Sequence, residues 1–268
     1  MRTLFTLLTI AVATPLLGAS VIVGALMRLP DRPGGLFDRV PRAWAWLILK
    51  AAGVRVVVHG EDRIAGREAN VFAANHVSWF DVFVMAAALR HYKFIAKAEL
   101  ERIPIFGRAV RAAGFIFIDR NNRKAAFAGY EAAADRMRDG FSVIVYPEGT
   151  RGASYALRPF KKGPFVLAIA AGAPVVPTIV HGTREVQAAG SFFIRSGVVH
   201  LHFLDPVPTA GLSYDDRDRV ARLTWDRMAA AMESLHGVRS TAPGPALDSS
   251  DIVPLPPDTA RPLTHQST

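Results

Sequence analysis

His76 and Asp81 lie five positions apart in the segment 75–81, Asn-His-Val-Ser-Trp-Phe-Asp, which follows an apolar stretch. A neutral imidazole can accept a proton near pH 7, and a carboxylate on its other ring nitrogen fixes the tautomer. If His76 precedes a helix whose first turn holds Asp81, the carboxylate can fold back toward the imidazole. The same spacing also fits a structural role, in which Ser78 caps the helix and Asp81 accepts bonds from its first amides. The segment therefore predicts either a general base with its orienting acid or an ordinary helix start.

Other loops carry side chains that suit a phosphate group. Asp119 and Arg120 follow the apolar stretch 115–118, and the segment Tyr-Pro-Glu-Gly-Thr-Arg at 146–151 closes the next such stretch. Lys161 stands just before a predicted helix. Arginine is the side chain best shaped for bidentate contact with phosphate. Each loop alone fits a solvated turn or a surface ion pair equally well, but three such loops beside a candidate base favour a phosphate-binding site.

The elements that must position these loops alternate along the chain. Short, mostly apolar stretches predict strands at 54–59, 70–74, 93–97, 115–118, 142–146, 175–180 and 198–204. Helical patterns predict helices at about 79–90, 104–113, 122–137, 161–171 and 214–236. This alternation is typical of an α/β fold with a largely parallel sheet flanked by helices. In such sheets the site lies beyond the carboxyl ends of the strands, which is where the charged loops fall.

The composition favours an anionic partner and excludes thiol chemistry. Lys and Arg number 32 against 23 Asp and Glu, which gives a net charge of +9 and suits a phosphate-bearing substrate, an acidic membrane surface or nucleic acid. Cysteine is absent, so disulfides, Cys-ligated zinc and a Cys-bound acyl intermediate are excluded. His200 and His202 share one face of a predicted strand, which we interpret as a half-exposed strand. We expect no metal site.

The N-terminal segment predicts a membrane anchor. Residues 3–27 contain no charged side chain and are long enough to cross a bilayer as a helix. A cleaved signal peptide is the alternative, with a small-residue site at 11–13, but the apolar character continues well beyond it. Pro15 would kink a helix, so a bent or re-entrant insertion is as plausible as a straight span.

The residues after this segment predict its orientation. Basic side chains follow the apolar run, whereas Arg2 and the terminal amine precede it, so the positive-inside rule places the rest of the chain on the cytoplasmic face of the cell inner membrane. A helix from Pro41 to Gly53 is predicted next. Its Trp44 and Trp46 suit either the membrane–water boundary or an ordinary core helix.

These features divide the chain into three parts. Residues 1–53 are predicted to form membrane-anchoring and interfacial helices, and residues 54–240 an α/β domain. Residues 241–268 are rich in Pro, Ser, Thr and Asp and are predicted to be a disordered tail, because they cannot bury enough apolar surface to order themselves.

Four segments resemble the conserved blocks of the glycerolipid acyltransferase family, most closely those of the bacterial 1-acylglycerol-3-phosphate acyltransferases. The first is the HxxxxD segment at 75–81, and the third is 146–151, where phenylalanine is more usual than Tyr146. The second and fourth are at 114–120 and 176–179. The first and third blocks together are highly specific. The resemblance covers roughly residues 40–210.

This resemblance implies transfer of a fatty acyl group from a coenzyme A or acyl-carrier-protein thioester to the sn-2 hydroxyl of 1-acylglycerol-3-phosphate, giving phosphatidic acid. It implies that His76 is the general base and that Asp81 orients it. It further implies that the acceptor is held by the second- and third-block residues, to which we add Lys161: Arg120, Glu148, Gly149, Thr150, Arg151 and Lys161. No cofactor and no nucleic-acid partner are expected.

The residues themselves permit this chemistry. An alcohol that attacks a thioester must lose its proton, and a histidine base contributes about 10²–10⁴-fold in a typical enzyme. The tetrahedral oxyanion needs donors, for which the amides near Ser78 and Trp79 are candidates.

Other functions are disfavoured by missing motifs. No serine lies in the G-x-S-x-G elbow of a lipid esterase, and the glycine-rich Lys-Ser/Thr loop of a nucleotide hydrolase is absent. We find no nucleic-acid-binding signature of the known kinds. A lyso-ornithine lipid or another lysophospholipid remains an alternative acceptor, and a membrane-bound esterase a more distant alternative.

Overall fold

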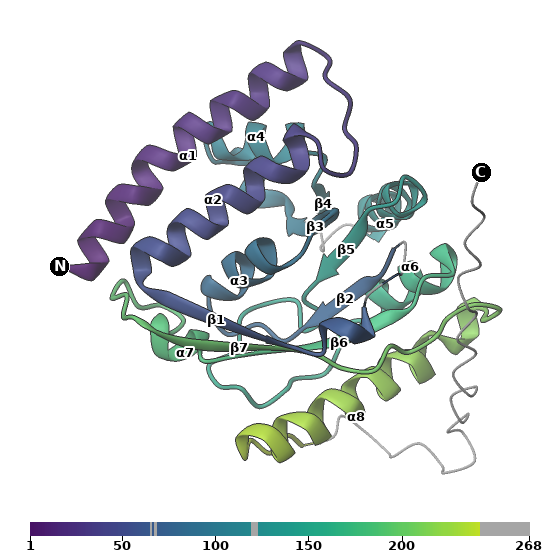
Figure 1. The fold of residues 1–268 in the computed structure, drawn as a ribbon. Coiled ribbons are helices and arrows are strands. Elements are labelled where there is room, and N and C mark those ends of the chain that lie inside the picture. The colour runs from purple at the N-terminus through teal and green to yellow at the C-terminus, as the bar shows by residue number, and fades with distance from the viewer. Residues whose placement is uncertain (65, 67–68, 119–122, 242–268) are drawn as a thin grey trace, which may run out of the picture.

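The computed structural model describes the chain apart from residues 65, 67–68, 119–122 and 242–268 (Figure 1). Arg120 and the predicted tail beyond residue 241 therefore lie outside the described residues. The described part forms a seven-stranded sheet of order β1-β7-β6-β2-β5-β3-β4. Its strands are β1 (Val54–His59), β2 (Val71–Ala74), β3 (Tyr92–Lys97), β4 (Ile116–Ile118), β5 (Ser142–Val145), β6 (Val175–His181) and β7 (Gly197–Phe203).

The sheet is largely parallel, as the sequence predicts. Neighbouring strands all pair in parallel except β6 and β7, which run antiparallel. Every residue of the central strands β2 and β5 is buried. Both faces of these strands are covered by helices, so their apolar runs need not alternate with polar residues.

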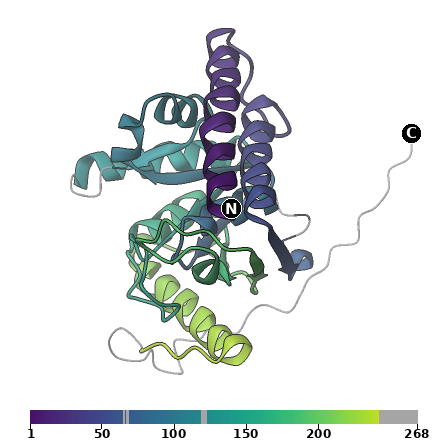
Figure 2. The same cartoon turned by 90° about the vertical axis from the view of Figure 1, so that its left-hand side faces the viewer.

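Helices cover both faces of the sheet and make three layers (Figures 1 and 2). On one face α2 and α3 pack against the apolar side chains of the strands, and on the other α5, α6 and α8 do so. The helices are α1 (Arg2–Leu26), α2 (Leu36–Ala52), α3 (Phe80–Ala88), α4 (Phe106–Ala112), α5 (Arg123–Arg138), α6 (Gly163–Ala171), α7 (Thr183–Val186) and α8 (Arg217–His236).

The start of α2 differs from the prediction. The helix begins at Leu36 and contains Pro41, although it ends at Gly53 as expected. The carboxylate of Asp38 in its first turn accepts hydrogen bonds from the amides of Gly34 (2.8 Å) and His91 (3.0 Å). This acid, and not the proline, therefore fixes where the helix starts.

The two tryptophans of α2 have different surroundings. The Trp44 indole donates to the Thr14 hydroxyl of α1 (3.1 Å), and its ring meets the edge of Phe83 in α3 at 5.3 Å between centroids. Trp46 is 52% exposed. The interfacial interpretation therefore fits Trp46, whereas Trp44 belongs to the core packing between helices.

The apolar helix α1 lies along the domain, side by side with α2 (Figure 2). It runs through Pro15 without a break, and it is a helix long and apolar enough to cross a membrane. Gly18 permits a close approach to α4, because a Cβ there would lie 3.3 Å from that of Ala109. Large apolar side chains on the remaining surface of α1 are exposed, among them Leu8, Val12 and Leu16.

A buried ion pair ties the loop between α1 and α2 to the sheet. Lys93 of β3 is fully buried, and its ammonium donates to Asp31 (2.8 Å) and to the Ala113 carbonyl (2.6 Å). Burial lowers the pKa of Lys93, and the bond to Asp31 opposes that shift. The N-terminal helices are thus attached to the α/β domain by charge as well as by apolar packing.

Candidate active site

The loop between β2 and α3 carries His76 and is fastened to the neighbouring strand β6. The Asn75 amide group donates to the Val180 carbonyl (3.0 Å), and its oxygen accepts from the Val180 amide (2.8 Å). This pair of bonds continues the sheet by one residue beyond β2. It fixes the backbone from which the His76 side chain projects, and that side chain is 13% exposed.

The structure brings His76 and Asp81 together at the start of α3. The Asp81 carboxylate is fully buried, and one of its oxygens lies 2.8 Å from His76 Nδ1. The same oxygen accepts from the amides of Val77 (2.7 Å) and Ser78 (2.8 Å). Its second oxygen accepts from the Thr183 hydroxyl (2.5 Å). Asp81 therefore binds the imidazole and also holds the loop that leads into α3, since the two amides precede the helix and are not its first amides as predicted.

This arrangement assigns the proton on the His76 ring. An ionised carboxylate oxygen can only accept, so Nδ1 carries the hydrogen and Nε2 keeps its lone pair. Among the residues that the structure describes, none is hydrogen-bonded to Nε2. The ring stacks on Tyr146 with 4.1 Å between centroids. His76 thus presents a basic nitrogen that its surroundings leave open.

Ser78 was predicted to be the N-cap of α3, but the helix begins at Phe80 and its N-cap is Trp79. The Ser78 hydroxyl accepts from the Phe80 amide (3.2 Å) and donates to the Gln187 carbonyl (2.7 Å), so it is occupied by bonds within the protein. Its own amide is bound to Asp81, so the prediction that this amide could hold an oxyanion is wrong. The neighbouring Trp79 amide makes no hydrogen bond within the described part of the chain.

The loop after β5 surrounds the backbone of His76. Gly149 adopts a left-handed conformation with φ of 84°, which favours glycine at this turn. Glu148 is buried and accepts from the His76 amide (3.1 Å). The Gly152 amide donates to the His76 carbonyl (2.7 Å). Both peptide groups of the candidate base are therefore held by this one loop.

Glu148 is itself held by an arginine that the sequence analysis missed. The Arg158 guanidinium donates to the second carboxylate oxygen of Glu148 (3.0 Å) and to the Thr150 hydroxyl (3.1 Å). Burial raises the pKa of Glu148, while the bonds from Arg158 and from the His76 amide oppose that shift. Since both of its oxygens are engaged within the protein, Glu148 organises the loop.

Two of the predicted cationic residues can be placed. The Arg151 guanidinium lies over the Trp79 ring, 4.7 Å from its centroid, at the same helix start as His76. Lys161 is exposed, and its amide donates to the Pro147 carbonyl (2.8 Å), which sets it beside the 146–151 loop. The third predicted cation, Arg120, lies outside the described residues. Arg151 and Lys161 are thus two cationic residues on segments that adjoin the His76 loop.

Thr183 is a further residue that sequence reasoning did not select. Thr183 is the first residue of α7. It is separated from the end of β6 by Gly182 alone, which has φ of 101°. The exit of this strand was recognised as a place to look, but no motif marks a threonine as the partner of a distant aspartate. Its alignment with Asp81 depends on β6 lying next to β2 in the sheet.

Comparison with known proteins identifies the kind of enzyme that carries these residues. A family model described as acyltransferase matches residues 55–181. A 1-acyl-sn-glycerol-3-phosphate acyltransferase of Limnanthes alba is 30% identical, over 81% of this chain and 75% of that one. A putative enzyme of the same name from Caenorhabditis elegans is 32% identical, over 69% and 67%. The chain belongs to the acyltransferase family.

Other members confirm the predicted family and fold. A bacterial relative from Borreliella burgdorferi, also named 1-acyl-sn-glycerol-3-phosphate acyltransferase, is 26% identical over 72% of this chain and 78% of that one. The crystal structure of the 1-acyl-sn-glycerophosphate acyltransferase PlsC from Thermotoga maritima superposes with a TM-score of 0.72 at 24% identity, covering 90% of this chain and 97% of that one. At this identity the likeness concerns the fold.

The acyltransferase match contains most of the site but not all of it. It includes His76, Asp81 and the loop at 146–151, and it ends two residues before Thr183. The Thr183 hydroxyl, which donates to the second oxygen of Asp81, therefore lies outside the matched residues and is found only from the three-dimensional structure.

We predict that Thr183→Val lowers kcat for acyl transfer about 10–100-fold with little change in KM, because a hydrogen bond to a charged group is worth roughly 1.5–3 kcal/mol. Thr183→Ser keeps the hydroxyl and should restore most of the rate. Steady-state kinetics of both variants test this, with thermal unfolding as a check on folding. If the Thr183→Val and Thr183→Ser enzymes had equal kcat values, the Thr183 hydroxyl would make no contribution to acyl transfer.

Proposed function

We propose that this acyltransferase moves a fatty acyl group from an acyl thioester, acyl-CoA or acyl-ACP, to the sn-2 hydroxyl of 1-acyl-sn-glycerol-3-phosphate. The observation that carries the proposal is the open Nε2 of His76, held in place by the buried Asp81. The names of the relatives support the acceptor, and so does the Arg151 guanidinium over the Trp79 ring at the start of α3.

His76 acts as a general base in the proposed reaction. Nε2 takes the proton of the acceptor hydroxyl as its oxygen bonds to the thioester carbonyl carbon, and the carbonyl electron pair moves to oxygen. The tetrahedral intermediate then collapses, the carbon–sulfur bond breaks, and the imidazolium returns the proton to the leaving thiolate. Asp81 stabilises the transient imidazolium and keeps the ring in its tautomer.

The developing oxyanion needs a donor that is not already bound. The Trp79 amide fits this requirement, since within the described residues it makes no hydrogen bond, unlike its neighbour Ser78. Removing one such donor typically costs about 10²–10³ in rate, so a single amide can carry much of the stabilisation.

The acceptor phosphate is assigned to the cationic residues of the predicted second and third blocks, together with Lys161. Arg151, Lys161 and the predicted Arg120 supply the charge, and the arginine fork suits bidentate contact. Glu148, Gly149 and Thr150 shape the loop that presents Arg151, with Glu148 acting as a positioning residue through Arg158. Holding the phosphate places the sn-2 hydroxyl against His76, which converts attack into an effectively intramolecular step.

His76→Ala should lower acyl transfer by at least about 10²-fold, because the base is lost. Transfer of a radiolabelled acyl group from both donor types gives the measurement. His91→Ala is the matched control, since His91 lies outside the site, where it pairs with Asp38 at 3.5 Å. Near-parent turnover of the His76→Ala enzyme would rule out the proposed base.

Arg151→Ala should raise KM for 1-acylglycerol-3-phosphate about tenfold or more and leave kcat much less affected, because a charge-assisted bond to the acceptor is lost. Arg239→Ala, which removes an exposed arginine paired with Glu233, is the control. Lyso-ornithine lipid, other lysophospholipids and an assay without acceptor complete the panel. A KM unchanged by Arg151→Ala, preference for a phosphate-free acceptor, or release of free fatty acid without acceptor would contradict the proposal.

We also propose that the enzyme lies on the cytoplasmic face of the inner membrane, with α1 immersed lengthwise in one leaflet. Two separate parts of α1 contact the domain: the Thr3 hydroxyl accepts from the Ile194 amide (3.0 Å), and Gly18 lies against Ala109 of α4. A straight crossing would therefore draw the domain into the bilayer. The exposed apolar side chains of α1 suit contact with lipid chains, and the basic residues after it suit contact with anionic headgroups.

Because the chain has no cysteine, single introduced cysteines report the side of the membrane. Ala210→Cys, in an exposed loop, and Arg2→Cys, at the start of α1, should both react with an impermeant maleimide in inverted inner-membrane vesicles and stay unlabelled in intact spheroplasts. Labelling of both in detergent is the control. Reaction of the Arg2→Cys variant from the outer side would establish a spanning helix.

A further inference from the structure

Five of the eight histidines gather on the face of the sheet that lies under α8. They are His59 of β1, His181 of β6, His200 and His202 of β7, and His236 at the end of α8, and we call them the histidine cluster. In the strand register His59 pairs with His202, and His181 pairs with His200. Directly paired residues project from the same face, so four imidazoles converge from three neighbouring strands.

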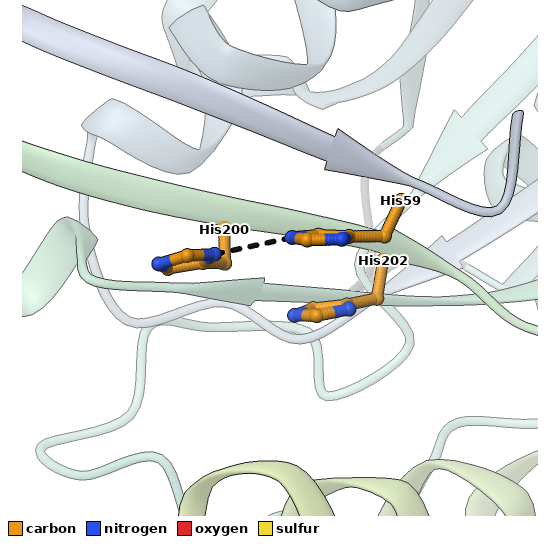
Figure 3. A group of neighbouring side chains, drawn as sticks. All are labelled: His59, His200 and His202. Atoms are coloured by element: carbon orange, nitrogen blue, oxygen red, sulfur yellow. Dashed lines mark hydrogen bonds between the residues drawn. The ribbon is translucent and has the colours of Figure 1, made fainter.

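Two pairs of ring nitrogens in the histidine cluster lie at the separation of metal ligands. Figure 3 shows the His59 and His202 rings lying over one another, with His200 beside their nitrogen-bearing ends. His59 Nε2 is 3.1 Å from His200 Nδ1, and His202 Nε2 is 3.3 Å from His236 Nε2. Two nitrogens bound at about 2.0–2.1 Å to a tetrahedral zinc ion lie about 3.3 Å apart.

A third ring belongs to the same group, at a longer distance. One ligand atom from each of His59, His200 and His202 falls within 4.8 Å of the others, which is wider than the spacing around a bound zinc ion. The stacked rings would therefore have to rotate and tilt until their lone pairs meet at one point. His59 is exposed, which gives an ion a path from solvent. His236 supplies a fourth nitrogen from the helix above.

The donor set indicates the class of metal. Neutral imidazole suits zinc, copper and nickel and is a poor ligand for magnesium or calcium.

We propose that His59, His200, His202 and His236 bind one zinc ion. The ion would fasten the end of α8 to β7 and to the edge strand β1. In the sequence His200 and His202 form only a pair, too few ligands for a metal site, whereas in the fold His59 and His236 lie beside them. The proposed site is structural and does not depend on the proposed acyl-transfer function, because His76 belongs to the layer on the opposite face of the sheet.

The test uses the full chain, purified without a histidine tag, stripped with chelator and titrated with ZnCl₂. We expect one zinc ion per chain and a rise in the unfolding temperature on binding. His59→Ala and His202→Ala should each weaken zinc binding at least tenfold and abolish the thermal shift. His91→Ala, a histidine outside the cluster, is the matched control and should behave as the parent.

Cobalt(II) loading of the parent gives a readout that does not depend on the folding of any variant. The strong visible absorption of tetrahedral cobalt is expected, and zinc should displace it. Absence of saturable zinc uptake, an octahedral cobalt spectrum, or parent-like affinity in folded His59→Ala and His202→Ala proteins would each overturn the proposal.

Discussion

A carboxylate removed from water must be satisfied by hydrogen bonds, and the Asp81 side chain imposes this requirement on the whole site. Its two oxygens accept from two amides, one hydroxyl and one imidazole, which come from the β2–α3 loop and from α7. Loss of one of these partners would leave buried charge uncompensated. The positions of His76 and Thr183 are therefore coupled, and the imidazole faces outward because its Nδ1 is bound to this buried carboxylate.

Strand β6 connects this requirement to the rest of the molecule. Its Val180 backbone fixes Asn75 on one side of the strand, and Thr183 follows at its end. His181, on the opposite face, stacks on Tyr155 at 4.3 Å and on His236 at 3.8 Å. The Tyr155 hydroxyl accepts from the amides of Gly182 and Arg184, at either side of Thr183. The same turn is thus held by Asp81 through the Thr183 hydroxyl and by Tyr155 through the two flanking amides.

The sequence predicted what local patterns determine. The apolar strands, most of the helices, and the fold-back of Asp81 onto His76 follow from hydrophobic periodicity and from the chemistry of a helix start. Contacts across long stretches of chain could not be predicted in this way. Arg158, Thr183 and the partners of His202 become neighbours of the site or the cluster only through strand order. The start of α2 was misplaced because Pro41 is a local signal, whereas Asp38 is fixed partly by the distant His91 amide.

Tyr146 shows which part of a side chain the site uses. Its ring supports the His76 imidazole, a task that the phenylalanine usual at this position would perform equally well. Its hydroxyl is buried and has no hydrogen-bond partner in the described part of the chain. Burial, with the nearby charge of Asp81, holds the pKa of this phenol well above its ordinary value. The phenol therefore stays protonated, and it is not a candidate for a general base beside the imidazole.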